Sequence, residues 1–321
     1  MTWLVTGACG YIGSHVAHLF NDNGLKVFAI DNLQTGFRTR LPSDFLFFEG
    51  DCSDSISIKR ICDEHNIIGV VHMAAKKMAG ESVREPLSYW TANTNALLGI
   101  LNGIKGTNVS SFVLSSSCSV YGSSNEVTEL SPLSPLSPYG RTKYYSEQIL
   151  LDVAQELSIK VMILRYFNVI GNSAKKDSVD RSPECLLPAV YDAIVNGSTP
   201  NIYGNKYDTF DGTCLRDYLD VRDLADAHYR SAQFLQNMSD SNYSGTFNVG
   251  IGQPRSVLEM VSLVCEAMDV PVKYVIKPPR KGDPAAVWSN AHAIGSLLDW
   301  KPIFSIEESV KSYVEGRRAN G

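Results

Sequence analysis

The stretch Gly7-Ala-Cys-Gly10-Tyr-Ile-Gly13 constrains the fold of this chain more than any other feature. A short apolar run, Trp3-Leu-Val-Thr6, precedes it with the pattern of a buried strand, and residues 14–20 follow with the pattern of a helix. Glycines at such a junction permit a tight turn and let the backbone approach a diphosphate, which the free N–H groups at the helix start attract. The spacing differs from the usual G-x-G-x-x-G fingerprint, so an ordinary strand-to-helix turn remains the alternative for this stretch alone.

An acidic residue at the end of the second predicted strand supports a dinucleotide site. Residues 26–30 are mostly apolar, and Asp31 follows them about 20 residues past the glycines. A carboxylate there accepts hydrogen bonds from the two ribose hydroxyls of an adenosine and repels a 2′-phosphate. The glycines and Asp31 together predict NAD, in preference to NADP, as the cofactor.

Strand-like and helix-like segments alternate through the first half of the chain. Strands are predicted at residues 45–48, 69–75, 112–121 and 160–164, and helices at 56–65, 89–104 and 139–154. This alternation predicts an α/β fold: a Rossmann-type, doubly wound parallel sheet with helices on both faces and ligands at the carboxyl ends of the strands. Ser117 and Ser119 lie at the carboxyl end of one such strand, and Asp51 and Cys52 follow another, where an adenine would lie.

A tyrosine and a lysine four residues apart begin one of these helices. Tyr139 and Lys143 follow the proline-rich stretch 131–138, and the helix pattern continues without Gly or Pro to Ala154. Residues i and i+4 share a helix face, and a nearby ammonium lowers the pKa of a phenol from about 10. Such a pair makes a base that can take a proton from an alcohol. Two surface residues on an amphipathic helix are the alternative from this stretch alone.

The pattern changes after Asn168. The second half predicts polar loops at 171–183 and 277–283, helices at 186–196, from 221 onward and at 256–268, and short strands at 202–204, 210–218 and 247–250. We expect a smaller mixed α/β domain that holds a substrate against the sheet. The predicted division is an NAD-binding domain at residues 1–170 and a substrate-binding domain at 171–321, with parts of 216–250 returning to the first.

Several motifs give the chain a resemblance to a known family. The glycine pattern, Ser117 and Tyr139-x-x-x-Lys143 resemble the extended short-chain dehydrogenase/reductases. A closer similarity, to the UDP-glucose (UDP-hexose) 4-epimerases, runs nearly end to end. It rests on Asp31-Asn-Leu33, Gly80-Glu-Ser-Val83, Ser115-Ser-Ser-Cys-Ser-Val-Tyr-Gly122, Ser137-Pro-Tyr-Gly140, Glu147-Gln-Ile-Leu150 and Arg165-Tyr-Phe-Asn168.

The resemblance implies epimerisation at C4 of a UDP-sugar by transient oxidation. Tyr139 would take the proton of the C4 hydroxyl, Lys143 would lower the pKa of that tyrosine and hold the nicotinamide ribose, and Ser117, assisted by Ser119, would hydrogen-bond the sugar oxygen. A 4-keto sugar would turn over and take hydride on its other face, so NAD would be a tightly held prosthetic group. The residues expected at NAD are Gly7, Gly10, Tyr11, Ile12, Gly13, Asp31, Asn32, Asp51, Cys52, Ala74, Lys77, Asn93, Ser115, Tyr139, Lys143 and Tyr166.

The substrate residues are likewise implied by the resemblance. Arginines suit a diphosphate because their planar fork binds two oxygens at once, although an isolated arginine is equally consistent with a surface salt bridge. Tyr203 matches an aromatic position against uracil. One departure is Glu184-Cys185-Leu186, where the family commonly has Asn-Asn-Leu, because an acid near a diphosphate is unfavourable unless it points away. The residues expected at the substrate are Lys77, Ser117, Tyr139, Asn168, Leu186, Tyr203, Arg216, Arg280, Asp283 and Val287.

The sugar itself is predicted from one position. In the family the residue that matches Val287 borders the sugar near C2, where a bulky tyrosine leaves room for a hydroxyl and a small residue leaves room for an N-acetyl group. Val287 is small, so we expect UDP-GlcNAc and UDP-GalNAc to be accepted alongside UDP-Glc and UDP-Gal. The alternative is that Val287 is a core residue at a slightly shifted position.

Composition limits the remaining options. A net charge of −5 gives no reason to expect nucleic acid or an anionic membrane, and no apolar run approaches the roughly 20 residues of a membrane helix. The seven cysteines lack a C-x-x-C pair, the six histidines lack metal-ligand spacing, and the first strand leaves no room for a signal peptide. We expect a cytoplasmic enzyme without a metal, and the resemblance suggests a homodimer formed through the helices at 89–104 and 139–154.

Three other activities remain as alternatives. A nucleotide-sugar 4,6-dehydratase needs an Asp-Glu pair after its active-site Thr, where this chain has Cys118-Ser119. A reductase would consume NADPH, which Asp31 disfavours. A non-catalytic NAD-sensing module is disfavoured by the intact set of Ser117, Tyr139 and Lys143.

Overall fold

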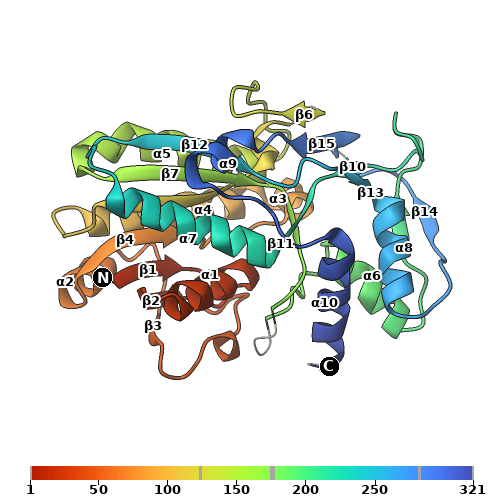
Figure 1. The fold of residues 1–321 in the computed structure, drawn as a ribbon, viewed down its shortest axis with the longest axis horizontal. Coiled ribbons are helices and arrows are strands. Elements are labelled where there is room, and N and C mark those ends of the chain that lie inside the picture. Colours follow the sequence, from red (N-terminus) through yellow and green to blue (C-terminus); the bar gives the residue numbers. More distant parts are fainter. Residues whose placement is uncertain (1, 123–124, 174–177, 281–282, 320–321) are drawn as a thin grey trace.

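The computed structural model describes residues 2–122, 125–173, 178–280 and 283–319, whose arrangement Figure 1 shows. Its larger part is built on a parallel sheet of seven strands, which confirms the predicted doubly wound α/β fold. In spatial order these strands are β12 (Ser244–Val249), β7 (Lys160–Tyr166), β5 (Ser111–Ser117), β4 (Ile67–His72), β1 (Thr2–Thr6), β2 (Lys26–Asp31) and β3 (Leu46–Glu49). Residues 174–177 and 281–282, in the two predicted polar loops, lie outside the described residues.

Helices cover both faces of this sheet. Trp3 and Val5 pack toward α1 (Tyr11–Asp22) and α7 (Val221–Asn237), whereas Leu4 packs toward α2 (Ser55–Glu64) and α4 (Pro86–Ile104), because successive side chains of a strand point to opposite faces. Both faces of β1 are therefore buried, which explains its continuous apolar run. The helices are α1 and α7 on one face, and α2, α4 and α5 (Pro138–Leu157) on the other.

The second half forms a smaller mixed part with its own apolar core. Its helices α6 (Leu186–Val195), α8 (Val257–Ala267) and α10 (Ile306–Ala319) contribute most of that core. Its strands are β8 (Asn168–Ile170), β9 (Asn201–Tyr203), β10 (Leu215–Arg216), β11 (Tyr218–Asp220), β13 (Arg255–Ser256), β14 (Val275–Lys277) and β15 (Ala286–Ser289), with β6 (Glu126–Val127) joining from the first half. Residues 221–249 leave this part, because α7 packs on α1 and β12 pairs with β7.

Two capped helix starts position Ser117 and Tyr139. The strand predicted to reach Tyr121 ends at Ser117, because the short 3-10 helix η2 (Cys118–Val120) follows and the Ser117 hydroxyl caps it by accepting from Ser119 N at 3.2 Å. Helix α5 begins one residue before Tyr139, and its N-cap Ser137 accepts from Gly140 N at 3.1 Å. The remaining short helices are η1 (Arg38–Arg40), α3 (Ala79–Arg84) and α9 (His292–Leu298).

Candidate active site

A cavity of about 340 Å³ opens between the carboxyl edge of the large sheet and the smaller part. Residues from β5, η2, α5 and β7 line one wall, and residues from β9, β10 and α6 line the other. The predicted site residues that line it are Tyr11, Ile12, Lys77, Ser117, Ser119, Tyr139, Tyr166, Asn168, Leu186, Tyr203, Arg216, Arg280 and Asp283. The fold thus brings together residues that lie up to 272 positions apart, from Tyr11 to Asp283.

The glycine turn leaves the start of α1 open. Gly7 has a φ of +65°, and a Cβ on it would come within 2.8 Å of the backbone N of Ala74, so both its conformation and its contact require glycine. Gly10 is the N-cap, and among the described residues no side chain caps the helix. The first-turn N–H groups are therefore free to bind an anion such as a cofactor diphosphate.

Acidic side chains end the two strands beside this turn. Asp31 is buried, and its carboxylate accepts from Cys9 N at 2.9 Å and from Leu33 N at 2.8 Å. Burial raises the pKa of Asp31, while these two backbone bonds lower it. Asp51, after β3, accepts from Asn32 Nδ2 at 3.2 Å and from a backbone amide, which lowers its pKa. This arrangement fits the adenosine end of NAD.

Three other predicted cofactor residues, Asn93, Cys52 and Ser115, are buried. The amide of Asn93 donates to Lys76 O at 3.1 Å and to the Thr142 hydroxyl at 2.9 Å, and its oxygen accepts from Lys76 N at 2.8 Å. Asn93 is buried, so it fixes the loop after β4 against α5. Cys52 is also buried, and Ser115 supplies the carbonyl that accepts from Lys143.

Tyr139 lines the cavity, and Lys143 lies one helical turn further along α5; both side chains are buried. The ammonium of Lys143 donates to Ser115 O at 2.8 Å, and burial lowers its pKa to about 8, against an opposing effect of Glu147. Burial raises the pKa of Tyr139 well above its usual range, and neighbouring Tyr166 adds to this, whereas a hydrogen bond with Ser117 lowers it. The expected lowering by Lys143 is therefore not the dominant effect here, because the phenol is buried and the ammonium points to Ser115.

Two buried clusters support this pair, and sequence reasoning missed both. The Tyr89 ring packs edge-on to Tyr139 at 6.5 Å between centroids, and its hydroxyl donates to Glu81 at 2.7 Å. One turn after Lys143, Glu147 forms an ion pair with Arg165 at 2.6 Å. Glu81, Glu147 and Arg165 all lie in motifs that carried the family resemblance, and these motifs were the sequence signal that could have identified them.

A further acid that sequence reasoning missed lies on the cavity wall. Both carboxylate oxygens of Asp180 are 3.4 Å from Nζ of Lys77, and Ser182 donates to the same carboxylate from its backbone N and its hydroxyl. The unusual Glu184 pairs with Arg84 at 2.7 Å on the rim. The Arg84 guanidinium thus partly neutralises the Glu184 carboxylate, which reduces the repulsion of a diphosphate that the sequence led us to expect at this position.

The opposite wall carries arginines and an aromatic ring. Arg216 donates to Asp283 at 2.5 Å and to Pro284 O at 2.7 Å, so its guanidinium is held in place. The guanidinium carbon of Arg280 lies 4.2 Å from the centre of the Tyr203 ring. A planar aromatic surface and two guanidinium groups suit a nucleoside diphosphate.

Val287 lies behind the cavity wall. It is buried in a cluster with Tyr121, Val127 and Phe167, and among the described residues it is not one that lines the cavity. Phe167 and Cys118 belong to this cluster and do line the cavity. Val287 is therefore a buried core residue that packs behind residues of the cavity wall, and its contact with a sugar stays a prediction.

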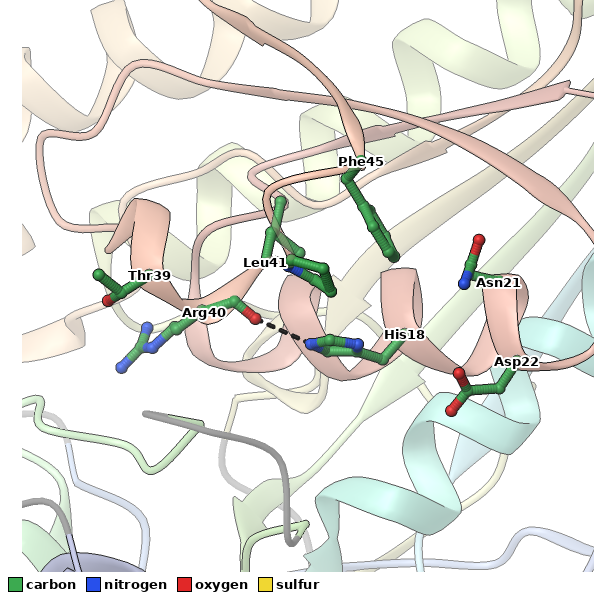
Figure 2. A pocket seen from close by; sticks show the side chains of 8 residues that line it. His18, Asn21, Asp22, Thr39, Arg40, Leu41 and Phe45 are labelled. Carbon is green, nitrogen blue, oxygen red and sulfur yellow. Dashed lines mark hydrogen bonds between the residues drawn. The ribbon is translucent and has the colours of Figure 1, made fainter.

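A second hollow of about 440 Å³ lies beside η1 and α1 (Figure 2). It is lined by His18, Asn21, Asp22, Thr39, Arg40, Leu41, Pro42 and Phe45. None of these residues belongs to the predicted site. Among the residues the structure describes, no group of three or more candidate metal ligands occurs, and no helix is long and apolar enough to cross a membrane.

The fold and this site define an NAD-dependent enzyme of the nucleotide-sugar-modifying class. Residues 3–250 match the model of the NAD dependent epimerase/dehydratase family, and the chain belongs to that family. UDP-glucose 4-epimerase from Lactobacillus helveticus is 35% identical over 307 residues, which cover 94% of this chain and 92% of that protein.

Two solved structures are similar over nearly their whole length. One is UDP-glucose-4-epimerase from Stenotrophomonas maltophila with bound NAD and formylated UDP-arabinopyranose, with a TM-score of 0.93, 32% identity, and coverage of 99% of this chain and 98% of that one. The other is the UDP-Glc/GlcNAc 4-epimerase from Campylobacter jejuni, with a TM-score of 0.84, 31% identity, and coverage of 99% of each chain.

Proposed function

We propose that this protein is a UDP-sugar 4-epimerase that inverts C4 through a 4-keto intermediate and keeps NAD bound throughout. The observation that carries the proposal is the pairing of two walls in one cavity. One wall holds Ser117 and Tyr139, with Lys143 behind them, and the other holds Tyr203 and Arg216. The first set suits removal of a proton from an alcohol, and the second suits a nucleoside diphosphate.

We assign the following roles to the reactive residues, and their positions in the cavity support this assignment. NAD, when bound, would supply the hydride acceptor and donor that the reaction needs. Tyr139 takes the proton from the C4 hydroxyl, and Ser117 hydrogen-bonds the same oxygen. The ammonium of Lys143, held by Ser115 O, stabilises the phenolate and binds the nicotinamide ribose. Because burial raises the pKa of Tyr139, its deprotonation depends on nearby positive charge, which Lys143 and the bound nicotinamide would supply.

The cofactor and substrate assignments extend along the cavity. The open start of α1, with Tyr11 and Ile12, binds the diphosphate of NAD, and Asp31 binds its adenosine ribose. Tyr203 stacks on uracil, and Arg216 and Arg280 bind the diphosphate of the sugar nucleotide. Asn168, Leu186, Asp283 and Lys77 complete the substrate site.

The substrate range includes the N-acetylated sugars. Val287 packs against Phe167 and Cys118, so a small residue at position 287 allows these two side chains to lie farther from the sugar. The similar protein from Campylobacter jejuni is a UDP-Glc/GlcNAc 4-epimerase, which supports this range. We therefore propose turnover of UDP-Glc, UDP-Gal, UDP-GlcNAc and UDP-GalNAc.

We further propose a cytoplasmic homodimer. Helices α4 and α5 pack side by side and expose large apolar side chains that a second copy would cover. These are Leu87, Leu98, Tyr145 and Leu151, which are between 39% and 77% exposed. All seven cysteines are free thiols, as suits a reducing compartment. The proposed domains are residues 1–170 with α7 and β12, and the remainder of 171–321.

The experiment that tests the function uses purified protein without added cofactor. It is incubated separately with the four UDP-sugars, the products are separated, and a denatured sample is assayed for released nucleotide. We expect each sugar to interconvert with its C4 epimer and the released nucleotide to be NAD. Bound NAD without any change in the sugars, or a dehydrated 4-keto product, would overturn the epimerase assignment, and release of mainly NADP would overturn the role of Asp31.

A further inference from the structure

A short segment of the second half, residues 178–182, is linked to the glycine turn through Arg40, and we name it the strap. The carbonyl of Val179 accepts a hydrogen bond from Nη2 of Arg40 at 2.7 Å. The carbonyl of Asp180 accepts one from the hydroxyl of Tyr313 at 3.2 Å. The strap is therefore held from η1 in the larger part and from α10 in the smaller part.

Arg40 connects the strap directly to the glycine turn. Its guanidinium also donates through Nη1 to the carbonyl of Cys9 at 3.2 Å, and Cys9 lies between Gly7 and Gly10. The carbonyl of Arg40 accepts from Nε2 of His18 at 2.8 Å, and Figure 2 shows the guanidinium directed away from that ring. The backbone of Arg40 is thus anchored to α1, while its side chain bridges two carbonyls that lie 170 residues apart in the sequence, from 9 to 179.

The bridge lies beside the place where NAD fits. The N–H of Cys9 donates to Asp31, at the adenosine end of the glycine turn. The strap carries Asp180, which pairs with Lys77 on the wall of the cavity that Tyr11, the first residue of α1, also lines. A dinucleotide whose diphosphate binds the start of α1 therefore has the strap as its neighbour on the substrate side.

We propose that Arg40 is a positioning residue for the cofactor, which ties the strap to the glycine turn and thereby slows the dissociation of NAD. The arginine is buried and has two carbonyl acceptors, so the strap cannot move away from the turn without breaking a charge-assisted hydrogen bond. This inference rests on the proposed function only in requiring bound NAD. It assigns a role to a residue that touches neither the sugar nor the reacting atoms.

The test measures the exchange of bound NAD in the holoenzyme. Wild type, Arg40→Met and Arg40→Lys are loaded with NAD, mixed with excess radiolabelled NAD, and followed by gel filtration over time. We expect Arg40→Met to exchange NAD about 10- to 100-fold faster, the factor that loss of a charge-assisted hydrogen bond produces. Arg40→Lys should fall between the two, because an ammonium keeps the charge but loses the fork that reaches both carbonyls.

A matched control separates this role from general loosening. Arg230 on α7 also donates to two backbone carbonyls of a distant segment, those of Leu298 at 3.2 Å and Asp299 at 3.0 Å. Arg230→Met should leave the exchange rate unchanged, and urea denaturation of each variant reports its loss of stability. Exchange at the wild-type rate in Arg40→Met, or equal acceleration in both Met variants, would overturn the proposal. A wild-type protein that binds no NAD would overturn the cofactor assignment as well.

Discussion

Two ion pairs in this protein have the same N–O distance and opposite environments. Arg165 and Glu147 meet at 2.6 Å with side chains that are 6% and 1% exposed, whereas Lys105 and Glu156 meet at 2.6 Å with side chains that are 63% and 61% exposed. Water screens the second pair, so its net contribution to the free energy of unfolding is below about 1 kcal/mol. We therefore predict that burial, and not the N–O distance, decides how much Arg165 and Lys105 each contribute to the free energy of unfolding.

Replacing Arg165 by Leu leaves a buried carboxylate without its cation. Glu147 would keep the hydrogen bond from the Ser116 hydroxyl but lose two nitrogen donors, Nη2 at 2.6 Å and Nε at 3.0 Å. Breaking a buried pair in this way costs about 3–5 kcal/mol. The double variant Glu147→Leu/Arg165→Leu removes both charges, and we expect it to recover most of that loss because apolar side chains can replace a buried pair at little cost.

Urea denaturation of the NAD-loaded protein measures these differences. Four proteins are compared with wild type: Arg165→Leu, Glu147→Leu, the double variant, and Lys105→Leu as the exposed control. The reasoning requires a large loss in both buried single variants, a smaller loss in the double variant, and almost none in the control. If Arg165→Leu loses no more stability than Lys105→Leu, or if the double variant loses the sum of the two single variants, the buried pair does not act as described.

Three shorter predictions concern the site. Tyr139→Phe should lose nearly all turnover yet bind NAD and UDP as tightly as wild type, because only the proton acceptor is removed; turnover within a few-fold of wild type would assign the base to another residue. In NAD-free protein, the pKa of Lys143 is about 8 in the folded state against an ordinary 10.5, so the folded state binds fewer protons than the unfolded state between these pH values. The free energy of unfolding of wild type, relative to Lys143→Met, should therefore rise by up to roughly 3 kcal/mol as pH rises from 8 to 10.5. Equal dependence of the two proteins on pH in urea denaturation would contradict this. Val287→Tyr should push Phe167 or Cys118 into the cavity and abolish turnover of UDP-GlcNAc while sparing UDP-Glc. Overpacking of the core should also lower the free energy of unfolding by about 1–3 kcal/mol. Equal activity of the variant on both sugars would show that residue 287 does not control the size of the pocket.

The sequence by itself determined the parts of this protein whose geometry is local. The glycine turn, the acid that ends β2 and the helix that begins before Tyr139 depend on neighbours within a few residues, and each was predicted in its observed place. The parallel sheet followed from the alternation of strands and helices, because parallel neighbours need a crossover helix. The boundaries were less accurate: the strand expected to reach Tyr121 ends at Ser117, where a hydroxyl caps the next turn.

Only the tertiary structure decided which side chains meet across long separations. Lys77 and Asp180, Glu147 and Arg165, and the bridge from Arg40 to Val179 join segments whose relative placement depends on the packing of the whole core. The same holds for Val287, which the fold buries in a cluster with Phe167 behind the cavity wall. Spacing along the chain records the period of a helix or strand, but it carries no distance between two elements, and that distance is set by how their apolar faces pack.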